Sequence, residues 1–157
     1  MGIFTRFRDI VSSNINAMLD RAEDPEKLIK LMIREMEDTL VEIKAACAGV
    51  MAAQRRNGRR LEDLRAREGQ WQERARLAVD KGRDDLAREA LVEKRRFTEA
   101  AAALESEMAD QGAIVAQYQD DIRQLEEKLG KAQEKQRQLV QRHVRAHQAR
   151  RAREEMR

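Results

Sequence analysis

The apolar side chains of this chain recur every three or four residues from about residue 25 onward, with charged side chains between them. One series in the first half takes Ile29, Met36, Ile43, Val50, Asn57, Leu64, Trp71 and Ala78, and a second takes Ile33, Leu40, Cys47, Gln54, Leu61, Glu68 and Ala75. The second half carries Phe97, Leu104, Gln111, Tyr118, Leu125, Ala132 and Leu139, and also Ala101, Met108, Val115, Ile122, Leu129, Gln136 and His143. A heptad repeat sustained over this many residues predicts a coiled coil.

Two breaks in this pattern divide the chain. At the first, Asp24 can cap a helix and Pro25 suits the first helical position, so a helix is predicted to begin at Pro25 and an earlier one to end near residues 20–23. At the second, Gly82 can end a helix in left-handed geometry, and Asp84 or Asp85 can cap the next helix. The short connection makes the two arms, about 25–81 and 85–157, antiparallel neighbours that pair residue i with about residue 164 − i.

Residues 1–24 form a separate segment that reads as a short amphipathic helix and a linker. Its apolar side chains fall at helical spacing on one face, namely Ile3, Phe4, Phe7, Ile10, Val11, Ile15 and Met18. A helix this short is marginal in water and needs a surface against which to fold. Two surfaces stay open: a membrane interface, where Arg6 and Arg8 favour anionic lipid, or the hairpin or a neighbouring chain.

Composition agrees with long helices, since 39% of residues are charged and only 3% are aromatic. No alternating run of β-branched residues bounded by turns is present, so the predicted fold is all-α, a long antiparallel coiled-coil hairpin preceded by the N-terminal helix. Cys47 is the only cysteine, which fits a reducing compartment, and its heptad position predicts a buried side chain.

The net charge of +3 is unevenly distributed, because residues 131–157 hold nine Lys or Arg against three acidic residues. This basic end indicates either an anionic partner or simply a solvated helix end. Without interleaved aromatic side chains or a reader motif, only nonspecific phosphate contact with nucleic acid is expected.

The residues that usually carry catalysis or bind metals are not arranged for it. His143 and His147 lie one helical turn apart, but no Cys or H-E-x-x-H context accompanies them. No G-x-x-x-x-G-K-[ST] sequence is present, and carboxylates such as Glu126 have no predicted pocket. We therefore expect no enzyme, no metal and no cofactor.

Three stretches of the chain resemble a known family. The opening MGIFTRFRDIVSSNINAMLDRAEDPEKLIKLMIREMEDTLVEIK, the stretch GRDDLAREALVEKRR at the predicted tip and the later QLEEKL are similar to the phage shock protein A family. That family includes the vesicle-inducing proteins of plastids and cyanobacteria and belongs to the ESCRT-III superfamily.

The resemblance implies a bacterial envelope-stress effector that is cytoplasmic and peripheral on the inner membrane. Such a protein binds the cytoplasmic membrane face through its first helix, here Ile3 to Leu19, and self-assembles to stabilise or remodel lipid. It also negatively regulates a AAA+ transcription activator, phage shock protein F, through its hairpin. Family members usually continue for several further helices, so full polymer formation is in doubt for a chain that stops at Arg157. The alternative is a structural coiled-coil scaffold without a lipid role.

Overall fold

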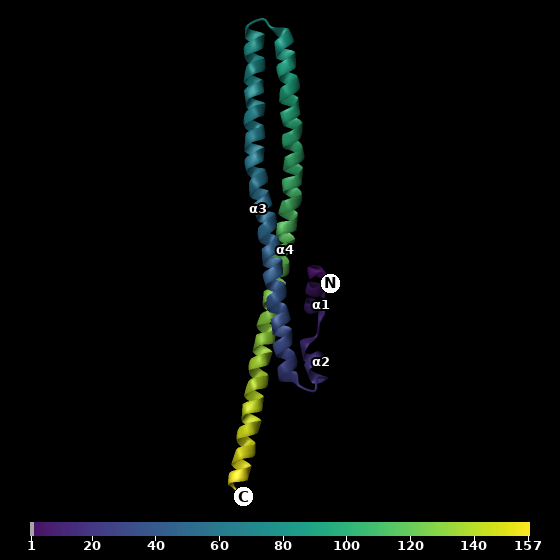
Figure 1. The fold of residues 1–157 in the computed structure, drawn as a ribbon, viewed down its shortest axis with the longest axis vertical. Helices are drawn as coiled ribbons and strands as arrows, with labels where there is room; N and C mark the ends of the chain where they lie inside the picture. The colour runs from purple at the N-terminus through teal and green to yellow at the C-terminus, as the bar shows by residue number, and fades with distance from the viewer. Residues whose placement is uncertain (1) are drawn as a thin grey trace. The chain divides into compact units, whose positions relative to one another are not determined.

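The computed structural model describes residues 2–157, and this range is helical with no strand (Figure 1). Its elements are α1 (Ile3–Ser12), α2 (Ile15–Asp20), α3 (Pro25–Asp80) and α4 (Asp84–Glu155). Helices α3 and α4 pack against each other as the arms of an antiparallel hairpin, which confirms the predicted fold class. The chain forms two compact units, one of residues up to Ala46 with Tyr118–Arg157, the other of Cys47–Gln117.

The hairpin turn in the second unit has the geometry that the sequence predicts at Gly82. This glycine has a φ of 71°, the left-handed conformation that other residues rarely adopt. The Gly82 N–H donates to the Val79 carbonyl at 3.0 Å, and the Arg83 N–H donates to the Ala78 carbonyl at 2.8 Å. These two bonds form a Schellman motif and satisfy carbonyls at the end of α3.

The predicted capping role of Asp84 is wrong, because Asp84 is the first residue of α4 rather than the residue before it. The carbonyl of Arg83 already accepts the Ala87 N–H at 3.0 Å, so Arg83 occupies the cap position. Asp84 and Asp85 lie in the first turn, where their negative charge complements the helix dipole.

Small and medium-sized side chains fill the seam between the arms in this unit. The buried apolar residues are Cys47, Ala75, Ala87, Ala90, Ala101 and Leu104. Asn57 is also buried, and its Nδ2 donates to Gln111 Oε1 at 3.1 Å, so this polar layer is satisfied internally. Cys47 is buried as predicted.

Arg67 lies over the Phe97 ring, as the predicted pairing of residue i with about residue 164 − i requires, but other side-chain contacts between the arms lie further along α4. Asn57 bonds to Gln111 and Arg65 pairs with Glu105, whereas the prediction places Glu107 and Glu99 opposite them. Helical side chains lean toward the N-terminus of their own helix. In an antiparallel pair the two side chains therefore lean in opposite directions, and contacting residues lie further along α4 than level Cα atoms do.

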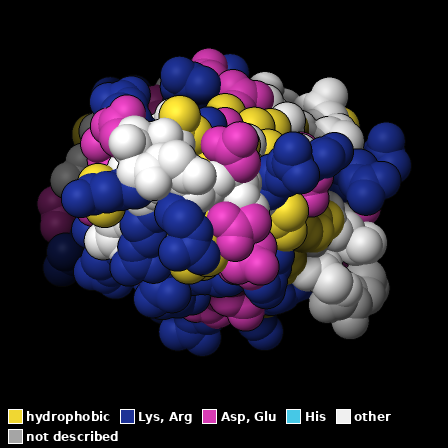
Figure 2. All heavy atoms as spheres, turned by 90° about the horizontal axis from the view of Figure 1, so that it is seen from above, with side chains coloured by type: hydrophobic (Ala, Val, Ile, Leu, Met, Phe, Trp, Pro, Cys, Tyr) yellow, Lys and Arg dark blue, Asp and Glu magenta, His cyan; other side chains and the backbone are white. Residues whose placement is uncertain are grey.

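In the first unit, α1 and α2 pack onto the beginning of α3 and the later part of α4 (Figure 1). The shared core consists of Phe7, Ile15, Leu19, Ile29, Ile33, Met36, Ile43, Leu125 and Ala132. Asp24 caps α3 as predicted, since its Oδ1 accepts the Lys27 N–H at 3.2 Å, and Pro25 is the first helical residue. Charged side chains cover much of the surface seen in Figure 2, with apolar atoms showing only in small areas.

Candidate functional site

The candidate site is the N-terminal strap, defined as residues 3–20, together with the surface of α3 and α4 that it covers. The predicted helix end near residues 20–23 is confirmed, since α2 ends at Asp20, but the expectation of one uninterrupted helix is wrong, because α1 ends at Ser12 and α2 begins at Ile15. The Ser13 hydroxyl donates to the Ile10 carbonyl at 2.6 Å, and Ser13 has extended backbone geometry. Asn14 Oδ1 then accepts the Ala17 N–H at 3.0 Å, which caps α2.

This break had a signal in the sequence, the consecutive residues Ser12, Ser13 and Asn14. Such side chains bond to nearby backbone groups and so compete with the helix. Amphipathic periodicity concealed the signal, because it continues across the break. The break turns Ile15 and Leu19 toward the core, where both are buried.

The predicted apolar face exists, and it lies against the hairpin. Phe7 and Ile15 are buried, while Ile3, Ile10 and Val11 are partly buried and pack on the same core. Phe4 and Met18 stay 45% and 42% exposed. Of the two surfaces that the sequence left open for this face, the structure shows the hairpin.

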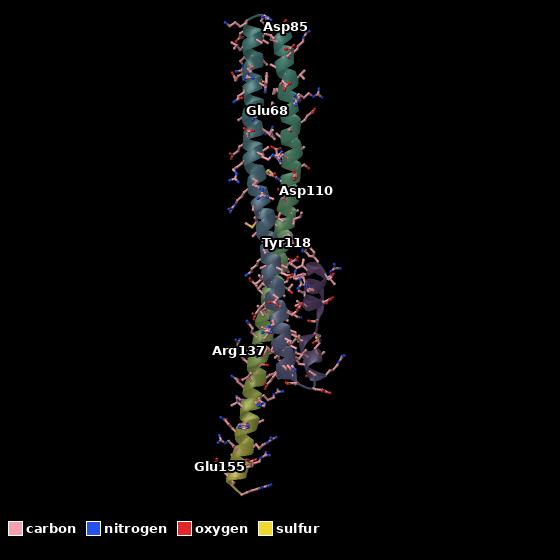
Figure 3. All side chains as sticks on the ribbon, viewed as in Figure 1. Glu68, Asp85, Asp110, Tyr118, Arg137 and Glu155 are labelled. Carbon is pink, nitrogen blue, oxygen red and sulfur yellow. The ribbon has the colours of Figure 1, made fainter. Side chains whose placement is uncertain are left out.

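Polar and aromatic contacts hold the strap at three places. The Arg6 guanidinium pairs with Glu42 of α3, whereas Arg8 is exposed. The Phe4 ring stacks on Tyr118, with ring centroids 5.7 Å apart and 11° between their planes; Figure 3 labels Tyr118 beside the strap.

The third contact is made by the half-buried Lys128 of α4. Its Nζ donates to the Ser13 carbonyl at 2.5 Å and to the Val11 carbonyl at 3.4 Å. Periodicity cannot find such partners, since they are more than a hundred residues apart in the chain.

The ionisable groups with resolved pKa shifts lie in surface ion pairs of the second unit. Hydrogen bonds from Thr98 to Glu68 and from Arg83 to Asp85 lower the pKa of each carboxyl, and Glu105 raises the pKa of Arg65. These side chains line no enclosed site, so the shifts have a structural origin.

Residues 2–157 contain neither a grouped set of metal ligands nor a membrane-spanning helix. Within residues 2–157, no three His, Cys, Asp or Glu side chains are grouped to hold a metal ion. His143 lies 3.5 Å from Glu26 as an exposed pair. None of the helices in this range has an apolar stretch long enough to cross a bilayer.

A helical hairpin whose own amphipathic strap covers part of its core places the chain among coiled-coil proteins with an N-terminal amphipathic helix. The model of the PspA/IM30 family matches residues 2–157, and the chain belongs to this family. The predicted resemblance to phage shock protein A is thereby confirmed.

Several characterised proteins are similar to this chain. It is 38% identical over 135 residues to the membrane-associated protein Vipp1 of Nostoc punctiforme, covering 86% of this chain and 52% of that protein. It is 35% identical over 132 residues to the phage shock protein A homolog of Bacillus subtilis, covering 82% and 55% of the two chains. The chain thus spans about half the length of the curated relatives it matches.

Proposed function

We propose that the chain is a peripheral membrane protein that binds lipid through the apolar face of its N-terminal strap. The observation that carries this proposal is the exposure of Phe4 and Met18, 45% and 42%, although both belong to that face. The hairpin therefore covers the face incompletely. Family membership supports the proposal, because relatives such as Vipp1 are named membrane-associated proteins.

Insertion into lipid requires the strap to leave the hairpin. Moving a buried side chain such as Phe7, Ile15 or Leu19 into water costs about 1.5–3 kcal/mol each, and lipid restores most of this. The exchange between protein and lipid is therefore nearly balanced for the apolar side chains. Polar contacts then decide its direction, and Arg6 would exchange Glu42 for anionic headgroups.

Self-association of the chain follows from the same exchange. Departure of the strap would uncover Ile29, Met36 and Leu125, which are otherwise buried in the first unit. An apolar surface of this kind needs cover, and a second copy of the chain is the proposed partner. Membrane stabilisation or remodelling by such assemblies on the cytoplasmic face of the inner membrane belongs to the proposal.

Negative regulation of a AAA+ transcription activator, phage shock protein F, is the second part of the proposal. It rests on the similarity to phage shock protein A. The outer faces of α3 and α4 are exposed and charged, as a surface for a protein partner requires. The alternative, a coiled-coil scaffold without a lipid role, is favoured by one observation, namely that the apolar face of the strap already has a protein partner.

Co-sedimentation with phosphatidylglycerol vesicles tests the lipid proposal. Phe4→Glu places a charge on the exposed part of the apolar face and should weaken binding about ten-fold or more, since burying a Phe is worth about 1.5–3 kcal/mol. Thr5→Glu adds the same charge at an exposed position of the same helix and serves as the control. Phe7→Glu is unsuitable, because Phe7 also belongs to the core.

The proposal fails if Phe4→Glu and Thr5→Glu sediment alike. Circular dichroism should show equal helicity for both variants, so that a difference in sedimentation reports the apolar face and not unfolding.

A further inference from the structure

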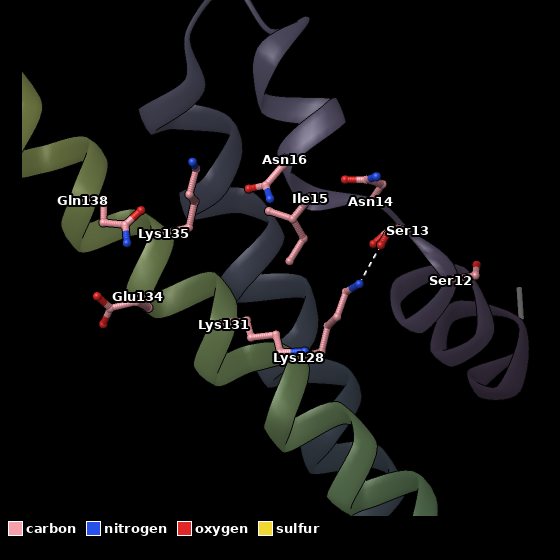
Figure 4. Close-up of a pocket in the computed structure, with 10 residues that line it drawn as sticks. All are labelled: Ser12, Ser13, Asn14, Ile15, Asn16, Lys128, Lys131, Glu134, Lys135 and Gln138. Carbon is pink, nitrogen blue, oxygen red and sulfur yellow. Dashed lines mark hydrogen bonds between the residues drawn. The ribbon is translucent and has the colours of Figure 1, made fainter.

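A crevice of about 570 Å³ separates the α1–α2 connection from one face of α4 (Figure 4). Both walls belong to the first compact unit. Ser12 to Asn16 form one wall, and α4 forms the other from Lys128 to Gln138. Apart from Ile15, every lining residue is polar or charged, so the crevice is distinct from the apolar face of the strap.

Three lysines line the α4 wall, and their charges are poorly compensated. Lys128, Lys131 and Lys135 are spaced by three and four residues, which places them on one face of the helix. Lys128 is engaged by two backbone carbonyls and by no carboxylate. Lys135 is half-buried and forms no ion pair within residues 2–157.

The nearby carboxylates do little to neutralise these lysines. Glu127 lies 3.8 Å from Lys131, and both side chains are about 70% exposed, a geometry that contributes little. Glu134 pairs with Arg137 at 2.6 Å, and Arg137 does not line the crevice. Figure 4 shows the Glu134 carboxylate directed away from the α1–α2 connection. Like charges one turn apart repel one another, so an anion between them would be stabilising.

The opposite wall adds neutral hydrogen-bond donors. The Oδ1 of Asn14 is occupied by the Ala17 N–H, which leaves its amide NH₂ as a donor. Asn16 supplies a second side-chain amide at the crevice. Lys131 and Lys135 lie about 6 Å apart along α4, one helical turn, so both ammonium groups can reach the oxygens of one phosphate group.

We infer that this crevice binds a phosphate group through Lys131, Lys135 and the side-chain amides of Asn14 and Asn16. Phosphate presents several strong acceptor oxygens and about two negative charges, which match ammonium and amide donors. Lys128 holds the opposite wall in place. A lipid headgroup and a soluble phosphate share this chemistry.

A ligand in the crevice would touch both the strap and α4, and so would bind only while the strap is docked. It would therefore shift the equilibrium toward the docked arrangement. The inference does not depend on insertion of the strap into lipid, and the two proposals can fail separately.

Calorimetric titration of the full chain with pyrophosphate tests the site. We expect saturable binding that the double substitution Lys131→Gln/Lys135→Gln weakens about ten-fold or more, because hydrogen bonds to charged groups contribute about 1.5–3 kcal/mol each. Lys27→Gln/Lys30→Gln removes the same charge from exposed positions of α3 in the same unit and should bind like the parent.

Vesicles of phosphatidylcholine and phosphatidic acid distinguish the source of the phosphate. A headgroup is the ligand if Lys131→Gln/Lys135→Gln lowers vesicle binding more than the control does while pyrophosphate does not bind. A soluble phosphate is the ligand if only pyrophosphate binding falls. The inference is overturned if neither probe binds, or if the crevice variant and the control lose equal affinity for both probes.

Discussion

At the scale of single residues, Lys128 joins parts of the chain that lie far apart in sequence. Its ammonium group reaches the Ser13 and Val11 carbonyls, two of the carbonyls left without helical partners where α1 ends. A cation at a helix C-terminus is also favoured by the helix dipole. Lys128 therefore stabilises both the end of α1 and its docking on α4.

Lys128→Gln should weaken strap docking by about 1.5–3 kcal/mol, the usual loss for a hydrogen bond from a charged group. Hydrogen exchange of the α1 amides measures this change, and their rates should rise about ten-fold or more as the strap opens more often. Lys131→Gln, measured in phosphate-free buffer, is the matched control, because Lys131 makes no bond to the strap. Unchanged α1 exchange in Lys128→Gln would contradict the role assigned to this contact.

At the scale of elements, the hairpin has one glycine that the fold requires and others that it tolerates. Gly82 has a positive φ in the turn, whereas Gly49 is an exposed helical residue of α3. A methyl group added at Gly49 would meet no atom within 4 Å. The same substitution should therefore have opposite effects at these two positions.

Gly82→Ala should lower the free energy of unfolding by about 1–2 kcal/mol, because a Cβ is disfavoured in left-handed geometry. Gly49→Ala should raise it by about 0.5–1 kcal/mol, because alanine has less backbone freedom to lose in a helix. Urea unfolding, followed by circular dichroism in the helical band at about 222 nm, measures both changes. Equal effects of the two substitutions would contradict the Schellman turn.

At the scale of the whole molecule, the strap is part of the core of the first unit. Phe7, Ile15 and Leu19 share that core with residues of α3 and α4. Deleting residues 1–24 would therefore expose apolar surface as well as remove the proposed lipid-binding segment. The full chain, and not residues 25–157, is the suitable material for testing regulation of the activator.

The full chain should inhibit the ATPase of the AAA+ activator without lipid, and anionic vesicles should relieve this inhibition. Relief requires that lipid and activator favour different states of the chain. Phe4→Glu is the control. It should inhibit the ATPase like the parent, but vesicles should not relieve that inhibition. ATPase rate against added chain, with and without vesicles, measures both effects. Inhibition that vesicles leave unchanged in the parent would contradict the switch, and absence of inhibition would contradict the contact itself.

The sequence alone determined the helical arms, the start at Pro25 and the turn at Gly82. Heptad periodicity, a cap by Asp24 and a left-handed glycine act within a few residues, so they can be recognised without the fold. The sequence also located the apolar face of the strap, but it did not determine which surface covers that face.

Only the tertiary structure decided what the strap covers and where it breaks. Which side chains meet across the seam depends on how the side chains of two different helices lean past each other, as the bond from Asn57 to Gln111 shows. The break at Ser13 depends on whether local side-chain bonds or the helix prevail, and burial of Ile15 and Leu19 favours the break. Lys128 and Tyr118 meet the strap only through folding, because contacts across more than a hundred residues have no local signature in the sequence.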